Sequence, residues 1–291
     1  MSAAMTTPEA VARTPRRELL GRQGKVGAFM LTMIVGTAAY GFLFLPDGAG
    51  KTREALPYAA PSGAHPLGTD DLGRDLLDQL LVGAGTSLTL AFLVAAVTTV
   101  LAAIIGGLAG IGPRWLSAII MRGIDVMLVL PELVLFILAA TFLGQSFGIR
   151  AAILAVILWP VPARVLRAAV LTSWSRAHVE AARAMGAGQA WLLARHASYL
   201  LGPLLVPVFV RTAMRVIIYD ATLSFLGLGD PTVPSWGTTL YWVQVNGVFL
   251  SDAWLWWAGP PGLAITLTVV ALALIGTSIE DRLNPNLQES Q

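Results

Sequence analysis

The 291-residue chain carries 56% hydrophobic and only 12% charged residues, whereas an ordinary soluble domain carries about 25% charged residues. This composition excludes a soluble surface and indicates an all-α integral membrane protein with one helical membrane domain. The formal net charge of +2 provides no basic field that could hold nucleic acid. With no cysteine, three histidines and no His-Glu-x-x-His pattern, the sequence also argues against a metal centre.

The first predicted span, residues 26–45, contains no charged residue and is long enough to cross a hydrocarbon core of about 30 Å. Residues 1–25 precede it and contain five basic residues, so we expect a cytoplasmic N-terminal segment. The apolar stretch is too long for a secretory signal. The pair Arg16-Arg17 leaves a twin-arginine signal as the alternative to an uncleaved anchor.

Residues 46–85 are expected outside the membrane, with a short helix in the outer interface. Thr69, Asp70 or Asp71 can cap the start of this helix, and Asp70 and Arg74 are candidate contacts for an external partner. The stretch 48–52 imitates the end of a phosphate-binding loop. Position 45 is leucine instead of the required glycine, so we interpret the stretch as a polar loop.

The other five spans form a predicted core over residues 86–280. The predicted spans lie at about 86–111, 124–143, between Arg150 and Arg164, 204–228 and 262–279. Residues 171–203 form a cytoplasmic loop, residues 229–260 an outer loop and residues 281–291 a cytoplasmic tail. With both termini inside, 13 of the 19 basic residues are cytoplasmic and four, Arg150 among them, are outside, which supports six spans.

Ionisable residues within the spans are costly and are therefore candidates for a pore or gate. Asp125 and Glu132 are seven positions apart, which places them on one face of the third span, and Arg211 and Arg215 share a face of the fifth. Asp220 lies off that stripe, which argues against a local Arg–Asp pair. Two interpretations stay open: these groups pair across helices inside the bundle, or they contact the substrate or form a gate.

The cytoplasmic loop predicts a helix, a glycine turn and a second helix. Gly186 can take a positive φ without the penalty of a Cβ atom. Apolar residues on such an exposed hairpin suggest a docking surface for a protein, and a loop that packs on itself is the alternative. The candidate contact residues are Glu180, Ala181, Ala182, Gly186, Trp191 and Leu192.

At these residues the chain resembles the membrane subunit of an ABC importer, and more specifically the C-type permease of dipeptide and oligopeptide importers. Glu180-Ala181-Ala182 with Gly186 is similar to the EAA loop through which such permeases contact their ATPase subunits. Three further stretches carry the resemblance: 68–75, 223–229 (Leu-Ser-Phe-Leu-Gly-Leu-Gly) and 234–237 (Pro-Ser-Trp-Gly). The chain departs from the family pattern after His196, where the family's Ile-Leu-Pro element is missing, and at Asp220, where the family usually has glutamate.

The resemblance implies a type I importer permease in the bacterial cytoplasmic (inner) membrane, forming half of a pore with a homologous B-type permease. One or two ABC ATPase subunits and an external substrate-binding protein would complete the system. The chain itself would have no catalytic site and bind no cofactor, since ATP and Mg²⁺ would belong to the ATPase subunits. Peptides are the expected substrate, with nickel, glutathione or another small solute open.

The outer loop 229–260 is expected to form an external gate or to contact the binding protein, with Asp230 and Trp236 as candidates. Its prolines stiffen it at low entropic cost. The alternative is a plain interfacial aromatic belt. The aromatic residues in question are Trp236, Tyr241, Trp242, Trp254, Trp256 and Trp257.

Two other classes of protein stay as alternatives. A proton-coupled secondary transporter would use Asp125, Glu132 or Asp220 as a relay, but no inverted repeat is visible in the sequence. An intramembrane hydrolase would need a nucleophile beside a base. All three histidines, His65, His178 and His196, lie outside the predicted spans, and no Gly-x-Ser-x-Gly elbow is present.

Overall fold

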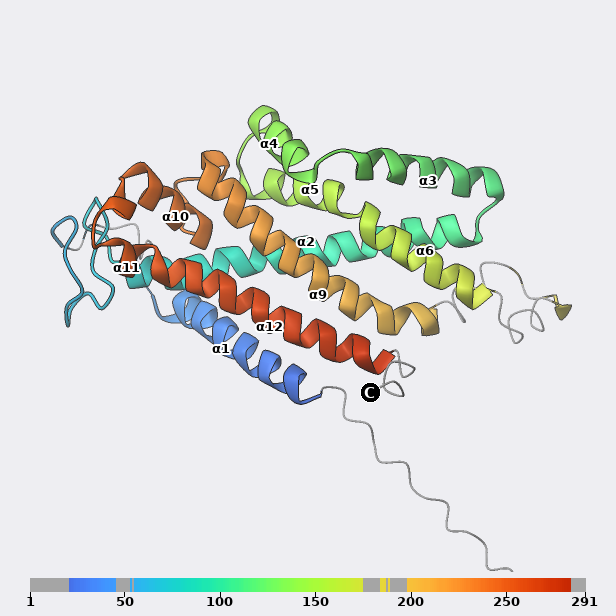
Figure 1. Ribbon diagram of the computed structural model, residues 1–291, viewed down its shortest axis with the longest axis horizontal. Coiled ribbons are helices and arrows are strands. Elements are labelled where there is room, and N and C mark those ends of the chain that lie inside the picture. Colours follow the sequence, from blue (N-terminus) through green and yellow to red (C-terminus); the bar gives the residue numbers. More distant parts are fainter. Residues whose placement is uncertain are drawn as a thin grey trace, which may run out of the picture.

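The computed structural model describes residues 21–45, 53, 55–174, 184–186, 188 and 198–283. Its helices lie side by side in one elongated bundle (Figure 1). Within the described part of the chain the only β pairing is an isolated bridge between Thr69 and Asp75. The predicted all-α class is confirmed.

The helices follow one another in chain order from Arg22 to Leu283. They are α1 (Arg22–Phe44), α2 (Leu76–Ile111), α3 (Arg114–Val129), α4 (Glu132–Leu143), α5 (Phe147–Leu158), α6 (Pro160–Trp174), α9 (Ser198–Leu223), α10 (Trp236–Val245), α11 (Trp254–Trp257) and α12 (Gly259–Leu283). A π-helical turn, η2 (Ser224–Leu228), directly follows α9, and a 3-10 turn, η3 (Val248–Leu250), lies between α10 and α11.

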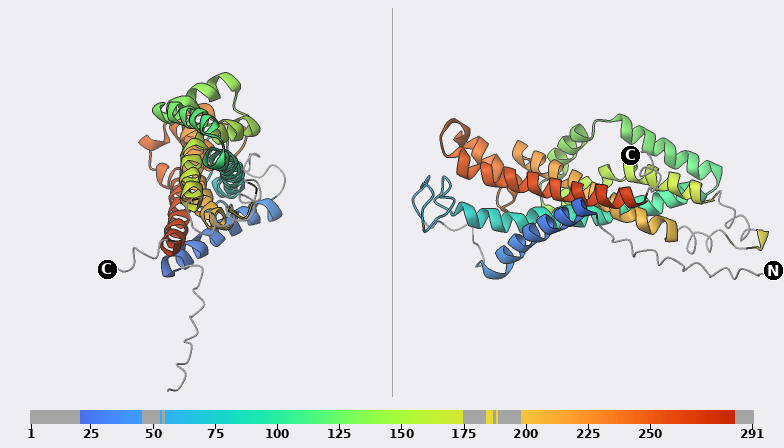
Figure 2. Two further views of the ribbon diagram at one scale, coloured as in Figure 1. Left: turned by 90° about the vertical axis from the view of Figure 1, so that its right-hand side faces the viewer. Right: turned by 60° about the horizontal axis from the view of Figure 1, so that its bottom comes forward.

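The 36-residue helix α2 is the centre of the bundle. Helices α1, α5, α6 and α9 pack on it, and α12 packs on α1 and α9. Small residues let the backbones approach, because a Cβ atom on Gly106 of α2 would lie 2.5 Å from the carbonyl oxygen of Ala163 in α6. Helix α1 and the α3–α4 pair lie at opposite edges of the bundle (Figure 2).

The chain is an integral membrane protein. Three of its helical stretches are long and apolar enough to cross a membrane: Arg22–Phe44, Leu76–Ile111 and Trp254–Arg282. The bent pairs α3–α4 and α5–α6 would each serve as one broken span, which raises the number in the described residues to five. Helix α9, with its prolines and charged residues, is not among them, so the count of six stays a prediction.

The third predicted span is not one continuous helix. Leu130 leaves the helical conformation, with φ −81° and ψ 135°, because the ring of Pro131 disfavours helix in the preceding residue. Helices α3 and α4 therefore meet at an angle of 89°. The prediction that Asp125 and Glu132 share one helical face is wrong, since they lie on different helices.

The outer interfacial helix predicted before the second span is also not separate, because it continues into α2. Asp75 is its N-cap and accepts hydrogen bonds from the backbone N–H groups of Leu77 (2.7 Å) and Asp78 (3.2 Å). The expected caps Thr69, Asp70 and Asp71 were therefore wrong. Asp70 stabilises the preceding turn instead, where it accepts from the backbone N–H of Arg74 at 2.8 Å.

The bundle has two distinct ends. The starts of α1 and α9 and the ends of α6 and α12 lie at one of them, where the backbone N–H of Gly21 donates to Ser278 Oγ at 2.8 Å (Figure 1). We name it the inner end, because the predicted topology places it in the cytoplasm. The outer end carries residues 55–75, α10 and α11. The orientation itself stays a prediction.

Candidate functional site

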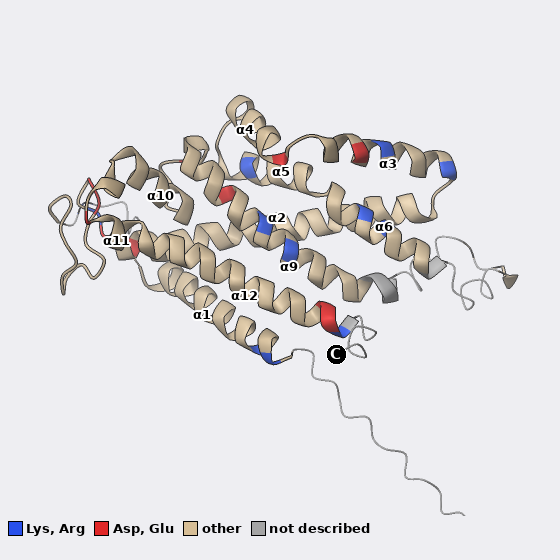
Figure 3. Ribbon diagram, viewed as in Figure 1, with Lys and Arg blue, Asp and Glu red and all other residues tan. Residues whose placement is uncertain are grey.

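Ion pairs join helices that are far apart in the sequence, and α9 takes part in most of them. In Figure 3 the charged residues lie on α3, α5, α6 and α9, near the inner ends of α1 and α12, and at the outer end around the start of α2. The pairs that link two helices are Arg150–Asp220 (α5–α9), Arg215–Glu132 (α9–α4), Arg211–Glu280 (α9–α12) and Arg164–Asp125 (α6–α3). Pairing across helices, one of the two open interpretations, is therefore what the structure contains.

The pair near the outer end is almost fully buried. Arg150 Nη1 donates to Asp220 Oδ1 at 2.7 Å and to Ser224 Oγ at 3.3 Å, and the two charged side chains are 2% and 6% exposed. Arg150 Nε has no partner among the described residues. Arg150, which the sequence placed in an outer segment, lies in the first turn of α5 and is buried. A buried guanidinium needs a nearby counter-charge, and Asp220 supplies it.

Two of the stretches that carry the family resemblance pack against each other beside this pair. In η2, Gly227 has a φ of 81°, and its carbonyl oxygen accepts from Gln145 Nε2 at 3.1 Å. A Cβ atom on Gly237 of α10 would lie 2.7 Å from the Cβ of Ser224. Glycine at Gly237 therefore permits the close approach of α10 to the end of α9.

The middle pair belongs to a three-residue cluster between α4 and α9. Arg215 pairs with Glu132, and Tyr219 Oη donates to Glu132 Oε2 at 2.7 Å. The guanidinium carbon of Arg215 lies 5.9 Å from the centre of the Tyr219 ring. The cluster is partly exposed, so these polar groups lie at the edge of the bundle core.

The inner pair lies beside a cavity. Arg211 contacts both carboxylate oxygens of Glu280, and its side chain is 67% exposed. A cavity of about 590 Å³ between α6 and α9 has apolar walls and is also lined by Arg211, Arg215 and Glu280. Glu280 was not among the predicted candidates, because the sequence placed it at the boundary of the last span.

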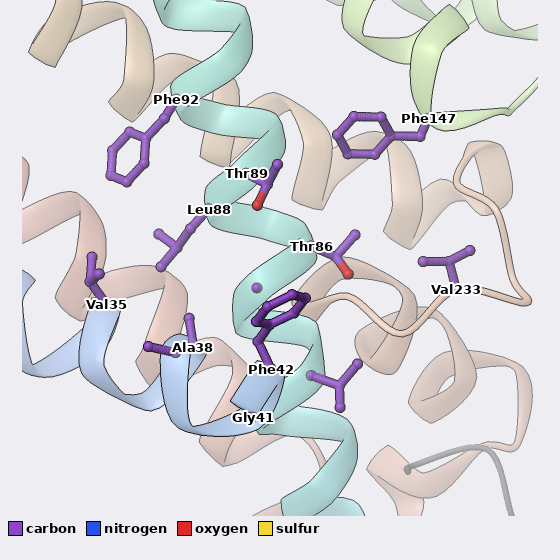
Figure 4. Close-up of a pocket in the computed structure, with 13 residues that line it drawn as sticks. Val35, Ala38, Gly41, Phe42, Thr86, Leu88, Thr89, Phe92, Phe147 and Val233 are labelled. Carbon is purple, nitrogen blue, oxygen red and sulfur yellow. The ribbon is translucent and has the colours of Figure 1, made fainter. Parts of the chain in front are cut away.

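A second cavity of similar size is chemically different. It has a volume of about 620 Å³ and lies in the outer half of the bundle between α1 and α2, where Phe147 and Val233 complete its wall (Figure 4). The residues that line it are apolar apart from Thr86 and Thr89. Such a surface offers no group that could recognise a charged solute, so the cavity beside Arg211 is the better candidate site.

At the outer end, two of the predicted external contacts lie inside the protein. Asp70 is 4% exposed and accepts from the side-chain amide of Gln79 at 2.8 Å. Trp236 is 2% exposed, and its indole N–H donates to the carbonyl oxygen of Leu80 at 3.3 Å. These two residues support the outer segment from within. Arg74 and Asp230 are partly exposed, so a binding protein could reach them.

The aromatic residues of the outer loop are not all at an exposed interface, because Trp236 and Trp257 are 2% and 1% exposed.

The outer end also contains a carboxyl group whose pKa is shifted, that of Asp71. Burial raises the pKa of Asp71 above its usual value, and the neighbouring carboxylate of Asp70 raises it further. Asp71 is therefore harder to ionise in the folded protein than a fully solvated aspartate is.

Of the predicted coupling residues, only Gly186 belongs to the described part of the chain. Its φ is 87°, the left-handed conformation expected for a turn glycine, and no atom lies within 4 Å of a Cβ placed there. A contact with an ATPase subunit stays a prediction. The residues outside the described part are Glu180, Ala181, Ala182, Trp191 and Leu192.

Comparison with known proteins identifies the family. Residues 102–289 match the family described as binding-protein-dependent transport system inner membrane component. The chain belongs to this family. The resemblance drawn from its loop and motif residues is confirmed.

Relatives in this family match most of the chain. The permease is 32% identical over 279 residues to a protein of Brucella suis named as a peptide permease, covering 96% of this chain and 92% of the relative. It is 36% identical over 228 residues to the di/tripeptide transport system permease protein DppC of Pseudomonas aeruginosa, covering 77% and 73%. Permeases of this family work with a binding protein and with ATPase subunits.

Proposed function

We propose that this permease forms half of the pore of an ATP-driven importer of dipeptides and oligopeptides in the bacterial cytoplasmic (inner) membrane. The observation that carries the proposal is the similarity to relatives named as peptide and di/tripeptide permeases, which covers 96% and 77% of the chain. Nickel, glutathione or another small solute are the alternative substrates within the same family.

A second, homologous B-type permease is proposed as the other half of the pore. The exposure of Arg211, at 67% of its side chain, supports this. A guanidinium that faces lipid within a membrane helix is costly, so this side of α9 needs water or another protein beside it. Apolar side chains on α3 and α4, such as Val129 and Leu138, are also exposed and suit a helix–helix contact.

The energy source is proposed to lie in one or two ATPase subunits that bind ATP and Mg²⁺. The chain would contribute the loop around Gly186 as their docking surface and no catalytic group of its own. Movement requires that the ATP-bound and ATP-free states contact this loop differently. Ion pairs from α9 to α4, α5 and α12 would then make these helices move together.

The proposal is tested by purifying the tagged permease from its native membrane in mild detergent and identifying co-purified subunits by mass spectrometry. The complex is then placed in proteoliposomes with the binding protein, and uptake of radiolabelled dialanine is measured with and without ATP. We expect uptake that needs both ATP and the binding protein and that a protonophore does not abolish. Uptake that continues without ATP and stops with the protonophore would support the secondary transporter instead, and uptake of nickel or glutathione alone would replace the peptide assignment.

A further inference from the structure

The cavity between α6 and α9 combines apolar walls with charges of both signs. Val161 and Val165 of α6 face it from one side and Leu204 and Val208 of α9 from the other. Its charged lining consists of the guanidinium groups of Arg211 and Arg215 and the carboxylate of Glu280. A volume of about 590 Å³ is within the range of small-ligand sites.

The exposure of Arg211 favours a cavity that opens to water. Arg211 lies in the middle of the 26-residue helix α9, yet 67% of its side chain is exposed. Its guanidinium contacts Glu280, which lies three residues before the end of α12 at the inner end of the bundle. An exposed charged pair of this kind suits an aqueous path through the membrane and not a lipid-facing surface.

From this placement, and resting on the proposed import of peptides, we propose that the cavity is a peptide-binding site within the pore. Arg211 binds the C-terminal carboxylate of the peptide and Glu280 binds its N-terminal ammonium group. The two ends of a short peptide carry opposite charges, as the two members of the pair do. The apolar walls accept peptide side chains of different shapes, which suits a transporter with a broad choice of peptides.

The ion pair also keeps the empty site stable. When no peptide is present, Arg211 and Glu280 neutralise each other, so no isolated charge is left in the membrane. When a peptide enters, one charge pair is exchanged for two. The net gain is small, because the original pair must open, and a transport site requires binding that is favourable enough for entry but weak enough for release.

Arg215 is a positioning residue in this scheme. It lies one helical turn from Arg211, about 6 Å along α9, and its pairing with Glu132 and contact with Tyr219 hold it in place. Its charge next to the cavity adds a positive potential that favours the carboxylate end of the peptide. The site is therefore polar in a defined direction, with the positive side on α9 and the negative side on α12.

The experiment uses the complete transporter in proteoliposomes, with saturating peptide-loaded binding protein. Three labelled probes are compared: dialanine, dialanine amide, which lacks the carboxylate, and N-acetyl-dialanine, which lacks the ammonium group. Each rate of uptake by a variant is divided by the wild-type rate for the same probe. The contribution of the binding protein then cancels, because the same binding protein serves both permeases.

We expect Arg211→Gln to lower dialanine uptake about tenfold, as for the loss of one charged hydrogen-bonded contact, with little change for dialanine amide. Glu280→Gln should lower dialanine uptake and leave N-acetyl-dialanine little changed. The double variant removes both charges, so a purely structural pair predicts near-normal uptake of all three probes, whereas the binding site predicts loss of dialanine uptake. Arg122→Gln is the matched control, because it removes an exposed arginine of α3 that does not line the cavity.

If a neutral variant fails to accumulate, the conservative Arg211→Lys and Glu280→Asp variants replace it and should shift the same probe ratios by a smaller factor. Equal losses for all three probes, or no loss in the double variant, would overturn the inference while leaving peptide import in place. If the variants leave the probe ratios unchanged but co-purify with less phosphatidylethanolamine than the wild type does, the inference is also overturned. The cavity would then be assigned to a lipid headgroup. If the wild-type transporter takes up no peptide at all, the proposed function fails along with the inference.

Discussion

The buried pair of Arg150 and Asp220 leads to a quantitative prediction. Asp220→Leu would leave the guanidinium of Arg150, which is 2% exposed, with Ser224 Oγ at 3.3 Å as its remaining hydrogen-bond acceptor among the described residues. Removing one member of a buried pair costs about 3–5 kcal/mol, because the other charge stays buried without compensation. We therefore expect a large fall in thermal stability and in the amount of folded permease in the membrane.

The matched control is the double variant Arg150→Met with Asp220→Leu. Apolar side chains of similar volume often replace a buried ion pair without loss of stability, so the double variant should be far more stable than Asp220→Leu alone. Asp220→Glu keeps the charge but adds one methylene to a buried position, where overpacking costs about 1–3 kcal/mol. It should fall between the wild type and Asp220→Leu.

The measurements are the midpoint of thermal unfolding in detergent and the amount of each variant in the membrane fraction. An Asp220→Leu variant as stable as the wild type would refute the reasoning. So would a double variant as unstable as the single one, because the damage would then come from shape and not from the unpaired charge.

Three further predictions concern other parts of the chain. Gly106→Ala should destabilise the bundle by about 1–3 kcal/mol, since the new Cβ would lie 2.5 Å from the carbonyl oxygen of Ala163, whereas Gly107→Ala meets no atom within 4 Å and should be neutral or stabilising in the same unfolding assay. Gly186→Val should accumulate normally but lose co-purified ATPase subunits and uptake, because a φ of 87° strains a β-branched residue by about 1–2 kcal/mol, and Gly186→Asn should retain more of both. Because the pKa of Asp71 is raised in the folded protein, its contribution to stability is present below the unfolded pKa and is lost as pH rises through the folded pKa. Asp71→Asn should therefore gain thermal stability relative to wild type as pH rises; a difference that is constant with pH would contradict this.

The long apolar helices could be predicted from sequence because an uncharged apolar run long enough to cross the hydrocarbon core is visible directly in the sequence. Residues 26–45 and 262–279 lie almost entirely within α1 and α12. The break at Pro131 was missed because hydropathy continues across it, although the residue before a proline is biased away from helix. This one missed break also removed the predicted shared face of Asp125 and Glu132.

The charged pairs show the limit of sequence reasoning more clearly. A helical repeat reveals which residues share a face, but it contains no information on which helices are neighbours. Arg150 and Asp220 are 70 positions apart, and Arg150 was assigned outside the membrane because its charge interrupts an apolar run. A lone arginine and a lone aspartate in two apolar segments were the available signal that they pair.

Helix α2 is longer than a membrane requires. At 1.5 Å per residue its 36 residues span about 54 Å, against a hydrocarbon core of about 30 Å. Its outer part is tied to Trp236 through Leu80, and its inner part to α6, where Arg167 Nε donates to the carbonyl oxygen of Ala109 at 3.3 Å. The helix is therefore a rigid lever: a tilt of about 5° displaces one end relative to the other by about 5 Å. A push on the outer face is carried by this single element to α6, whose last residue, Trp174, lies in the predicted cytoplasmic loop.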